Sequence, residues 1–281
     1  MNRLKRLISI VVLVVLASTG VVFADGLDDH EIRFDKILNA RDMGGYAAAD
    51  GKTVKRNMLI RSGELAYATN SDLMRLQTEY NLGQVIDFRY GPDFIYCPDK
   101  RIEGVEYKNI PVKYNKSPSK KAPKKRYKKL RKKGKKKLRK TVLKNFGKAS
   151  RSYTYSLVMS SYSQGRYRSY FDQLLANESG RGILMHCTFG KDRTGVAAFM
   201  TLIALGVDEE TAYRDYSMTN AYLKKYAKKR YKKGRRAVKE ADLRYAVNAA
   251  KNRYGSLENF LKEAYGLDEE KLIKLRNIYT E

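Results

Sequence analysis

The chain has 281 residues and a formal net charge of +28, with 58 Lys and Arg against 30 Asp and Glu. A chain of this length can bury a stable core without disulfides or a metal, and two cysteines are too few for a small disulfide-framed domain. Residues 113–151 hold 20 Lys and Arg and residues 224–239 hold 10, with no acid in either stretch. Arg3, Lys5 and Arg6 add three positive charges near the N-terminus. Subtracting these 33 positive charges from the net charge of +28 leaves −5 for the remaining residues. This division argues against a uniformly basic nucleic-acid-binding fold.

Residues 1–24 have the pattern of a secretory signal peptide. A short basic start precedes an apolar run over residues 7–17, and Ala24 is a small residue directly before the expected cleavage. The run is short for a membrane span and residues 18–20 interrupt it, so an uncleaved anchor is the second alternative. We therefore expect a mature protein that begins at residue 25 and acts outside the cytoplasm.

Short apolar strands alternate with helices along the rest of the chain. The expected strand segments are a hairpin at 47–53 and strands at 58–60, 84–88, 105–110 and 182–187. The expected helices are 69–80, 156–176, 196–205, 256–266 and 268–279. In the first helix, Ser71 is the expected N-cap and Gly83 is expected to follow the end. This alternation predicts an α/β fold with a mostly parallel sheet flanked by helices, over one domain at 25–281.

The stretch HCTFGKDRTG, residues 186–195, lies between an apolar strand and an apolar helix. Cys187 ends the expected strand and Arg193 begins the expected helix, so the five residues between them must form a tight loop. Such a loop directs successive amide N–H groups inward, and the helix N-terminus adds its own positive end. The sequence therefore predicts a cradle for a phosphate dianion.

The predicted chemistry is that of a cysteine phosphatase. The positive field stabilises a thiolate, which makes Cys187 the expected nucleophile, and the planar fork of Arg193 binds two phosphate oxygens. The Thr194 hydroxyl is expected to donate to the sulfur, and Gly190 allows close approach of the backbone. The expected substrate-binding residues are Thr188, Phe189, Gly190, Lys191 and Thr194. The alternative is an ordinary strand-to-helix turn with a buried Cys and a surface Arg.

This loop resembles the signature loop of the bacterial secreted tyrosine and lipid phosphatases of the protein-tyrosine-phosphatase superfamily. The stretches NARDMGGY, LIRSGEL, VIDFR and YRDYSMTNAYL resemble further segments of that family, and the resemblance covers most of residues 34–112 and 153–281. It implies a protein-tyrosine-phosphatase-like fold. Ala40, Asp93 and Cys97 depart from the residues usual in the family.

The proton for the leaving oxygen normally comes from a carboxylic acid. No Asp or Glu occurs from Tyr107 to Phe171, the region in which many tyrosine phosphatases carry a mobile acid loop. The resemblance favours Asp192, inside the loop, as the general acid. The alternatives upstream are Asp87, Asp93 and Asp99. A purely structural role for Asp192, paired with a nearby Lys or Arg, is also open.

Two neighbours of the nucleophile carry further expectations. Lys191 either recognises an additional anionic group, as on a phosphoinositide, or is a solvated loop lysine. We expect His186 to be buried and hydrogen-bonded and to orient the loop, rather than to carry protons. Because the chain has only two histidines and no evident His/Cys/carboxylate cluster, we expect no metal and no other cofactor.

The basic stretches 113–151 and 222–239 are expected to be insertions in the phosphatase domain. Clusters of Lys and Arg attract anionic headgroups, which favours a membrane surface, phosphoinositides or another polyanion as partner. A solvated tail is the alternative, and no signature of a nucleic-acid-binding fold supports nucleic acid.

Together these features predict a secreted, metal-independent phosphatase, with a thiophosphoryl-enzyme intermediate, that acts on phosphotyrosine, phosphoinositides or both. Hydrolysis of inositol polyphosphates is an alternative, as is a polyanion-binding surface protein with an incidental phosphatase domain. In an oxidising compartment Cys97 and Cys187 can also form a disulfide that inactivates the enzyme reversibly.

Overall fold

The computed structural model describes residues 29–91, 94, 95, 97–113, 150–226 and 237–281. Residues 1–31 and 32–281 are separate units, and every element named below belongs to the second. The predicted signal peptide and most of both predicted insertions lie outside the described residues. Among the described residues, no helix is both long enough and apolar enough to span a bilayer.

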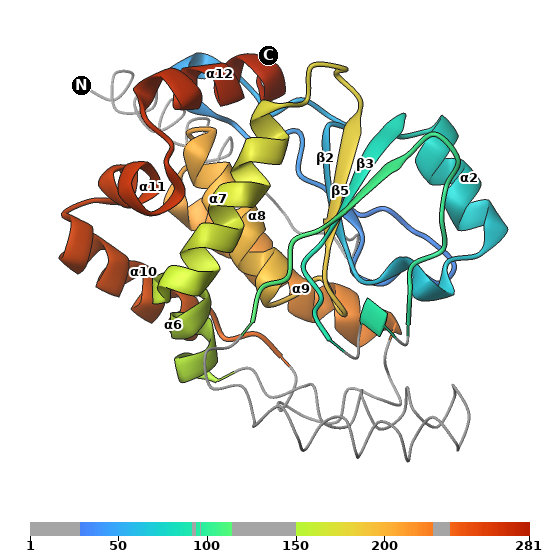
Figure 1. The fold of residues 1–281 in the computed structure, drawn as a ribbon, viewed down its shortest axis with the longest axis horizontal. Helices are drawn as coiled ribbons and strands as arrows, with labels where there is room; N and C mark the ends of the chain where they lie inside the picture. The colour runs from blue at the N-terminus through green and yellow to red at the C-terminus, as the bar shows by residue number, and fades with distance from the viewer. Residues whose placement is uncertain (1–28, 92–93, 96, 114–149, 227–236) are drawn as a thin grey trace, which may run out of the picture. The chain divides into compact units, whose positions relative to one another are not determined.

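A five-stranded sheet forms the centre of the second unit (Figure 1). Its strands are β1 (Arg41–Asp42), β2 (Leu59–Ser62), β3 (Leu82–Asp87), β4 (Glu106–Asn109) and β5 (Gly182–His186). The strand order is β1-β2-β5-β3-β4, with β1 antiparallel to β2 and the other pairs parallel. The prediction of a mostly parallel sheet is confirmed. Ser62 and Asp87 are both in register with His186, so the carboxyl ends of β2, β3 and β5 meet at one edge.

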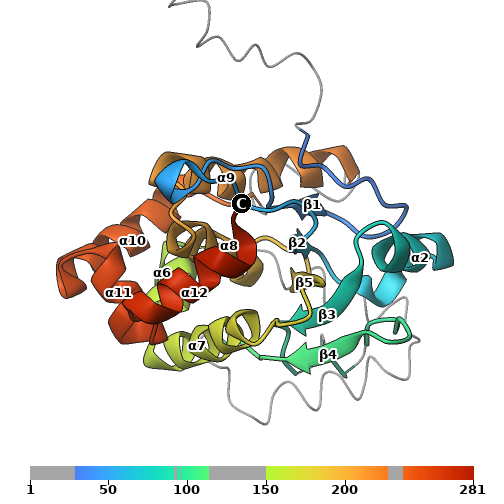
Figure 2. The same cartoon turned by 90° about the horizontal axis from the view of Figure 1, so that it is seen from above.

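Helices cover both faces of this sheet (Figure 2). The helix α2 (Asn70–Thr78) lies on one face. On the other side of the sheet lie α6 (Arg151–Met159), α7 (Ser161–Leu175), α8 (Arg193–Ala204), α10 (Glu240–Tyr254), α11 (Leu257–Tyr265) and α12 (Glu269–Tyr279), and α9 (Glu209–Tyr226) runs along the β1 edge (Figure 2). Neighbouring strand residues point to opposite faces: Ile183 packs in the larger core, whereas Leu184 packs in the smaller core with Leu76 of α2. A sheet buried on both faces explains the continuous apolar runs of its strands.

The hairpin at 47–53 is confirmed, but the details of helix α2 differ from the prediction. Ala47 and Thr53 pair across a turn in which Asp50 has a φ of 58°. The N-cap of α2 is Thr69 and not Ser71, because the Thr69 hydroxyl accepts from the Asp72 amide while the Asp72 carboxylate accepts from the Thr69 amide. The helix ends at Thr78, so the predicted end near residue 80 was wrong.

The predicted helix at 156–176 is two helices. Ser160 ends α6 in an extended conformation, with φ −77° and ψ 135°, and its side chain caps α7 by accepting from the Ser163 amide. The helix α6 starts at Arg151, earlier than predicted, because the Ser150 side chain caps it there, and it packs against α10. The first predicted insertion ends at Arg151, which lies in α6, and the second begins at Tyr222, which lies in α9. Each predicted insertion therefore overlaps a helix at one end.

Candidate active site

The loop 187–192 connects β5 to α8 at the carboxyl edge of the sheet. The predicted strand reaches only to His186, whereas α8 starts at Arg193 as expected from the motif. Gly190 allows the loop to turn, because its φ is +62° and an added Cβ would lie 2.2 Å from the Ser62 carbonyl oxygen. The loop backbone therefore passes against the end of β2 at a distance that only glycine permits.

Cys187 is buried, with 2% of its surface exposed. Burial raises the pKa of its thiol, but the charge of Arg193 and hydrogen bonds from the Thr194 hydroxyl and amide outweigh burial and lower the pKa. The Thr194 hydroxyl thus favours the thiolate, but it makes no hydrogen bond of good geometry among the described residues, so its predicted donation to the sulfur stays a prediction. The pocket favours the thiolate, which is the nucleophilic form of cysteine.

The Arg193 guanidinium lies beside the sulfur and is held from two sides. Its Nη1 donates to the Phe88 carbonyl at 3.1 Å, and its Nη2 donates to the Thr188 hydroxyl at 3.3 Å. The Tyr90 ring centroid lies 5.6 Å from the guanidinium carbon. These contacts fix the guanidinium plane beside the loop, and a planar guanidinium can bind two phosphate oxygens.

Lys191 and Asp192 form an ion pair within the loop. The Lys191 Nζ lies 2.7 Å from Asp192 Oδ2, and Lys191 is 2% exposed, so it is not a solvated lysine. Asp192 precedes α8 as its N-cap residue, but its side chain makes no capping hydrogen bond. The carboxylate predicted to be the general acid is therefore at the loop and is engaged by its neighbouring cation.

A buried cluster of five residues holds the outer side of the loop. We call it the Asp215 cluster, and its members are Asn39, Arg41, Arg61, Asp215 and Thr219. Arg41 Nε donates to Asp215 Oδ1 at 2.8 Å, and Arg61 Nη1 donates to Asp215 Oδ2. Burial alone raises the pKa of Asp215, but the charges of Arg41 and Arg61 lower it to about 2. Arg61 Nη2 donates to the Gly190 carbonyl at 3.0 Å, which links the cluster to the loop.

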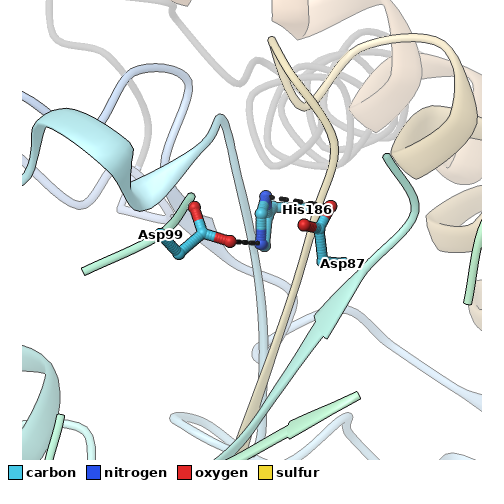
Figure 3. Close-up of side chains that lie close together, drawn as sticks. All are labelled: Asp87, Asp99 and His186. Carbon is cyan, nitrogen blue, oxygen red and sulfur yellow. Dashed lines mark ion pairs between the residues drawn. The ribbon is translucent and has the colours of Figure 1, made fainter. Parts of the chain in front are cut away.

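A second network, the Arg89 cluster, comprises Glu64, Asp87, Arg89, Asp99 and His186. Arg89 Nη2 donates to Asp87 at 2.9 Å and to Asp99 at 2.6 Å, and Nη1 donates to Glu64 at 2.9 Å. His186 lies between the two aspartates, with Nε2 3.1 Å from Asp99 Oδ2 (Figure 3). Burial lowers the pKa of His186, but the charges of Asp99 and Asp87 raise it to about 9.

His186 connects the Arg89 cluster to the nucleophile. At neutral pH an imidazolium donates at both nitrogens, and its Nδ1 lies 3.2 Å from the Cys187 carbonyl oxygen. Burial raises the pKa of Asp99, but His186 and Arg89 lower it to about 2. His186 is fully buried and contacts the Cys187 carbonyl oxygen, as expected, and its role in orienting the loop stays a prediction.

Asp87, Asp99 and His186 are also the one grouping that approaches a metal-ligand set in the part of the chain that the structure describes, with ligand atoms within 4.8 Å of one another. Arg89 already donates to both carboxylates, so a metal ion would have to compete with a bidentate guanidinium. A protonated His186 has no lone pair to offer a metal. The residues fit a charge network better than a metal site.

The upstream candidates for the general acid are placed differently from Asp192. Asp87 and Asp99 both bind Arg89, which keeps them as hydrogen-bond acceptors inside the Arg89 cluster. Asp93 lies outside the described residues. The predicted partner thiols, Cys97 and Cys187, are not joined by a disulfide, and the Cys97 sulfur lies 3.5 Å from the Tyr67 hydroxyl. The disulfide of an oxidised form stays a prediction.

Two aromatic residues beside the loop had no predicted role in the site. Tyr90 packs against the Arg193 guanidinium, as described above. Burial raises the pKa of the Tyr153 hydroxyl, which also lies within the electrostatic influence of Arg193 and Asp192. These rings give the loop aromatic neighbours.

The chain belongs to the tyrosine phosphatase family, whose sequence profile matches residues 32–281. It is 30% identical over 269 residues to a Cupriavidus necator protein provisionally named a tyrosine-protein phosphatase, covering 86% of this chain and 87% of that protein. A tyrosine-protein phosphatase of Nostoc commune is 29% identical over 132 residues, covering 41% and 44% of the two chains. Family membership makes the protein a phosphomonoester hydrolase.

Solved structures with detectable similarity include the Pseudomonas aeruginosa protein TpbA. One TpbA crystal structure matches with a TM-score of 0.33 and 16% identity, covering 72% of this chain and 96% of that chain. A second, a TpbA variant in complex with pTyr, matches with a TM-score of 0.36 and 16% identity, covering 83% and 94%.

Proposed function

We propose that this protein hydrolyses phosphotyrosyl groups through a thiophosphoryl-enzyme intermediate on Cys187, without a metal. The observation that carries the proposal is the buried Cys187 at the end of β5, facing a loop that leads into α8, whose first residue Arg193 is held by the Phe88 carbonyl and the Thr188 hydroxyl. A thiolate next to a fixed guanidinium at a helix N-terminus combines a nucleophile with a phosphate-binding site.

In the first step the Cys187 thiolate attacks phosphorus in line with the leaving oxygen. The S–P bond forms while the P–O bond breaks, and the electron pair of that bond goes to the leaving oxygen, which takes a proton from Asp192. Arg193 and the inward amides stabilise the charge on the equatorial phosphoryl oxygens. The products are the free phenol and phosphorylated Cys187.

In the second step water attacks the phosphorus of the intermediate. The P–O bond to water forms, the S–P bond breaks, and its electron pair returns to the sulfur as a thiolate. The Asp192 carboxylate accepts the proton that the water loses, which restores the acid for the next turnover. Inorganic phosphate then leaves the loop.

Lys191 supports the proposed role of Asp192 in a specific way. The Lys191 Nζ lies 2.7 Å from Asp192 Oδ2 and holds the carboxylate at the start of α8, where it makes no capping hydrogen bond. In this proposal the Lys191 ammonium group acts as a positioning partner for Asp192.

Phosphotyrosine is the substrate that the surroundings of the loop favour. The Tyr90 ring, 5.6 Å from the guanidinium carbon of Arg193, offers an aromatic face to a phenyl phosphate. Phosphoinositides and inositol polyphosphates have no such ring and depend on added cations. Lys191, the cation first considered for them, is engaged by Asp192.

We further propose that the enzyme is secreted after cleavage of residues 1–24 and that its basic insertions bind an anionic membrane surface. The proposal rests on the N-terminal sequence pattern and on 20 Lys and Arg in residues 113–151. Deleting residues 116–148 should leave hydrolysis of a small aryl phosphate unchanged and weaken salt-sensitive binding to anionic vesicles. Equal vesicle binding by both forms would refute the role of the first insertion.

The proposed activity is tested by a substrate panel in EDTA with wild type and Cys187→Ser. We expect turnover of phosphotyrosine peptides by wild type and none by the variant, while the variant still binds inorganic phosphate because Arg193 remains. Activity of Cys187→Ser equal to wild type would exclude a covalent mechanism at this residue. Faster turnover of phosphoinositides or inositol polyphosphates than of phosphopeptides would reassign the substrate.

The role of Asp192 is tested with leaving groups of different acidity. Asp192→Asn should slow substrates with poor leaving groups, such as tyrosyl phosphate, by about 10²–10⁴-fold, the usual contribution of general acid catalysis. Activated aryl phosphates should be slowed much less, because their phenolates depart without a proton. An equal loss on all substrates would show that Asp192 only shapes the loop.

A further inference from the structure

Asn39 is a buried residue, 150 positions from the loop in sequence, that binds two consecutive loop carbonyls. Its side-chain Nδ2 donates to the Phe189 carbonyl at 3.0 Å and to the Gly190 carbonyl at 2.9 Å. Asn39 is fully buried and has a φ of 56°, a left-handed conformation that Asn tolerates better than most residues. Asn39 thus combines a left-handed backbone with a buried side-chain amide whose two N–H groups both bond to one loop.

The orientation of this amide is fixed by the rest of the Asp215 cluster. Arg41 Nη1 donates to Asn39 Oδ1 at 2.8 Å, and Arg41 is itself bound to Asp215 and to the Thr219 hydroxyl. A flipped amide would point its NH₂ group at the guanidinium, so only one orientation is favourable. The two N–H groups of Asn39 therefore face the loop.

Fixing these carbonyls also fixes the amides that follow them. In a trans peptide the C=O and N–H groups point in opposite directions. Because the Phe189 and Gly190 carbonyls point toward Asn39, the N–H groups of Gly190 and Lys191 point to the other side of the loop. Inward amides on that side are what an anion nest requires.

We propose that Asn39 is a positioning residue that sets the affinity of the loop 187–193 for phosphate by holding two of its peptide groups in the binding orientation. The inference deepens the proposed function, since it concerns the same loop. Asn39 does not touch the substrate, and it acts through the Phe189–Gly190 and Gly190–Lys191 peptides. Arg61 supports the second peptide with its own bond to the Gly190 carbonyl.

The sharpest variant is Asn39→Asp. Asp has nearly the same shape, tolerates the left-handed conformation and still accepts from Arg41, but it cannot donate to either carbonyl. Asn39→Gly is the second variant, because it keeps the backbone conformation and removes the donors without adding a charge. The matched control is Asn81→Asp, the same change at an exposed residue with a φ of 42° at the start of β3.

The readouts are the inhibition constant of inorganic phosphate, kcat/KM on an aryl phosphate, the pH dependence of alkylation of the Cys187 peptide, and the melting temperature. For Asn39→Asp we expect phosphate to bind at least about 10-fold more weakly, and kcat/KM to fall by about 10²–10³-fold, as when one oxyanion donor is removed. The alkylation profile should shift to higher pH, because the thiolate loses inward amides. Asn39→Gly should show a smaller loss, and Asn81→Asp should match wild type.

A loss of stability alone leaves the phosphate constant and the alkylation profile of the folded enzyme unchanged. If Asn39→Asp or Asn39→Gly keeps wild-type values for both, the proposal is overturned, whatever its melting temperature. Should Asn39→Asp fail to fold, Asn39→Gly decides by the same two readouts. Phosphate binding and alkylation need no turnover. A wild type that binds phosphate but hydrolyses no phosphomonoester would therefore refute the proposed function and leave this inference to be decided by the variants.

Discussion

The Asp215 cluster and the Arg89 cluster hold different parts of the same loop, and their charges have opposite sign. The Asp215 cluster places two guanidiniums on one carboxylate and binds the loop through Arg61 and Asn39. The Arg89 cluster places one guanidinium and a protonated His186 against three carboxylates. Its ionised side chains sum to one negative charge, whereas those of the Asp215 cluster sum to one positive charge.

This difference in sign decides how each cluster responds to loss of a partner and to pH. The net positive charge of the Asp215 cluster is carried by arginine, whose guanidinium stays protonated at physiological pH. Excess carboxylate can take up protons, and the buried histidine can release one. The positive cluster is thus expected to be insensitive to pH near neutrality, and the negative cluster to be the sensitive one.

The largest effect on stability is expected for Asp215→Asn. The variant leaves Arg41 and Arg61 buried without a counter-charge, which should lower the free energy of unfolding by about 3–5 kcal/mol. The loss should be the same from about pH 5 to pH 8, since no group of the remaining cluster titrates there. Urea unfolding across this range measures the loss, with Arg75→Gln as the control, because Arg75 forms an exposed ion pair with Glu79 and such pairs contribute little to stability.

Arg89→Gln should lower the free energy of unfolding by a similar amount at about pH 8 and by clearly less at about pH 5. Without Arg89 the carboxylates of Asp87, Asp99 and Glu64 repel one another, so the pKa of Asp99, which His186 and Arg89 lower in the wild type, should rise relative to the wild type. Relative to the wild type, a raised folded pKa means that the folded state gains protons, and stability, as pH falls. A loss that is independent of pH would contradict the contrast between the two clusters.

His186 should make wild-type stability fall toward alkaline pH. Its pKa rises from 6.5 to about 9 on folding, so its contribution is complete below about pH 6.5 and is lost as pH rises through 9, on the order of 3 kcal/mol. The measurement is made in a Cys187→Ser background, because the lowered pKa of Cys187 gives the opposite slope. His186→Gln in that background should flatten the curve, and an unchanged slope would assign it to another group.

The smallest effect is expected for Cys97→Ser. Arg89 binds the Cys97 carbonyl at 2.8 Å, which the substitution keeps, and a serine hydroxyl can still hydrogen-bond the Tyr67 hydroxyl, so stability should change by less than about 0.5 kcal/mol. The variant also tests the predicted disulfide. After peroxide treatment a thiol reductant should restore wild-type activity more fully than that of Cys97→Ser, because an unprotected Cys187 oxidises further. Equal recovery would dismiss the disulfide.

The loop and the strands β2, β3, β4 and β5 could be predicted from the sequence because they depend on local pattern, whereas the two-residue strand β1 was not predicted. Apolar strands, the tight spacing of Cys187 and Arg193, and Gly190 between them are all contiguous. The helix α10 was not predicted, since it follows a basic stretch that masks it. Its buried residues Leu243, Ala246, Val247 and Ala250 nevertheless have the spacing of one helical face, and this signal could have identified it.

The Asp215 cluster could not be predicted in the same way. Arg41 and Asp215 are 174 residues apart, and their contact exists only after β1 and α9 have packed. The stretches NARDMGGY and YRDYSMTNAYL, which contain them, resemble segments of the phosphatase family, but no pattern in the neighbouring residues shows that an arginine will be buried.

The claim on which the account depends most is that Cys187 carries the phosphoryl group during turnover. It is tested most directly by mixing the enzyme with a fast-reacting aryl phosphate, quenching in acid within the first turnover, and mapping phosphorylated peptides by mass spectrometry. The account predicts phosphate on the peptide containing Cys187, bound through sulfur, and its absence in Cys187→Ser. Rapid hydrolysis with no phosphate on Cys187, or with phosphate on another residue, would contradict it.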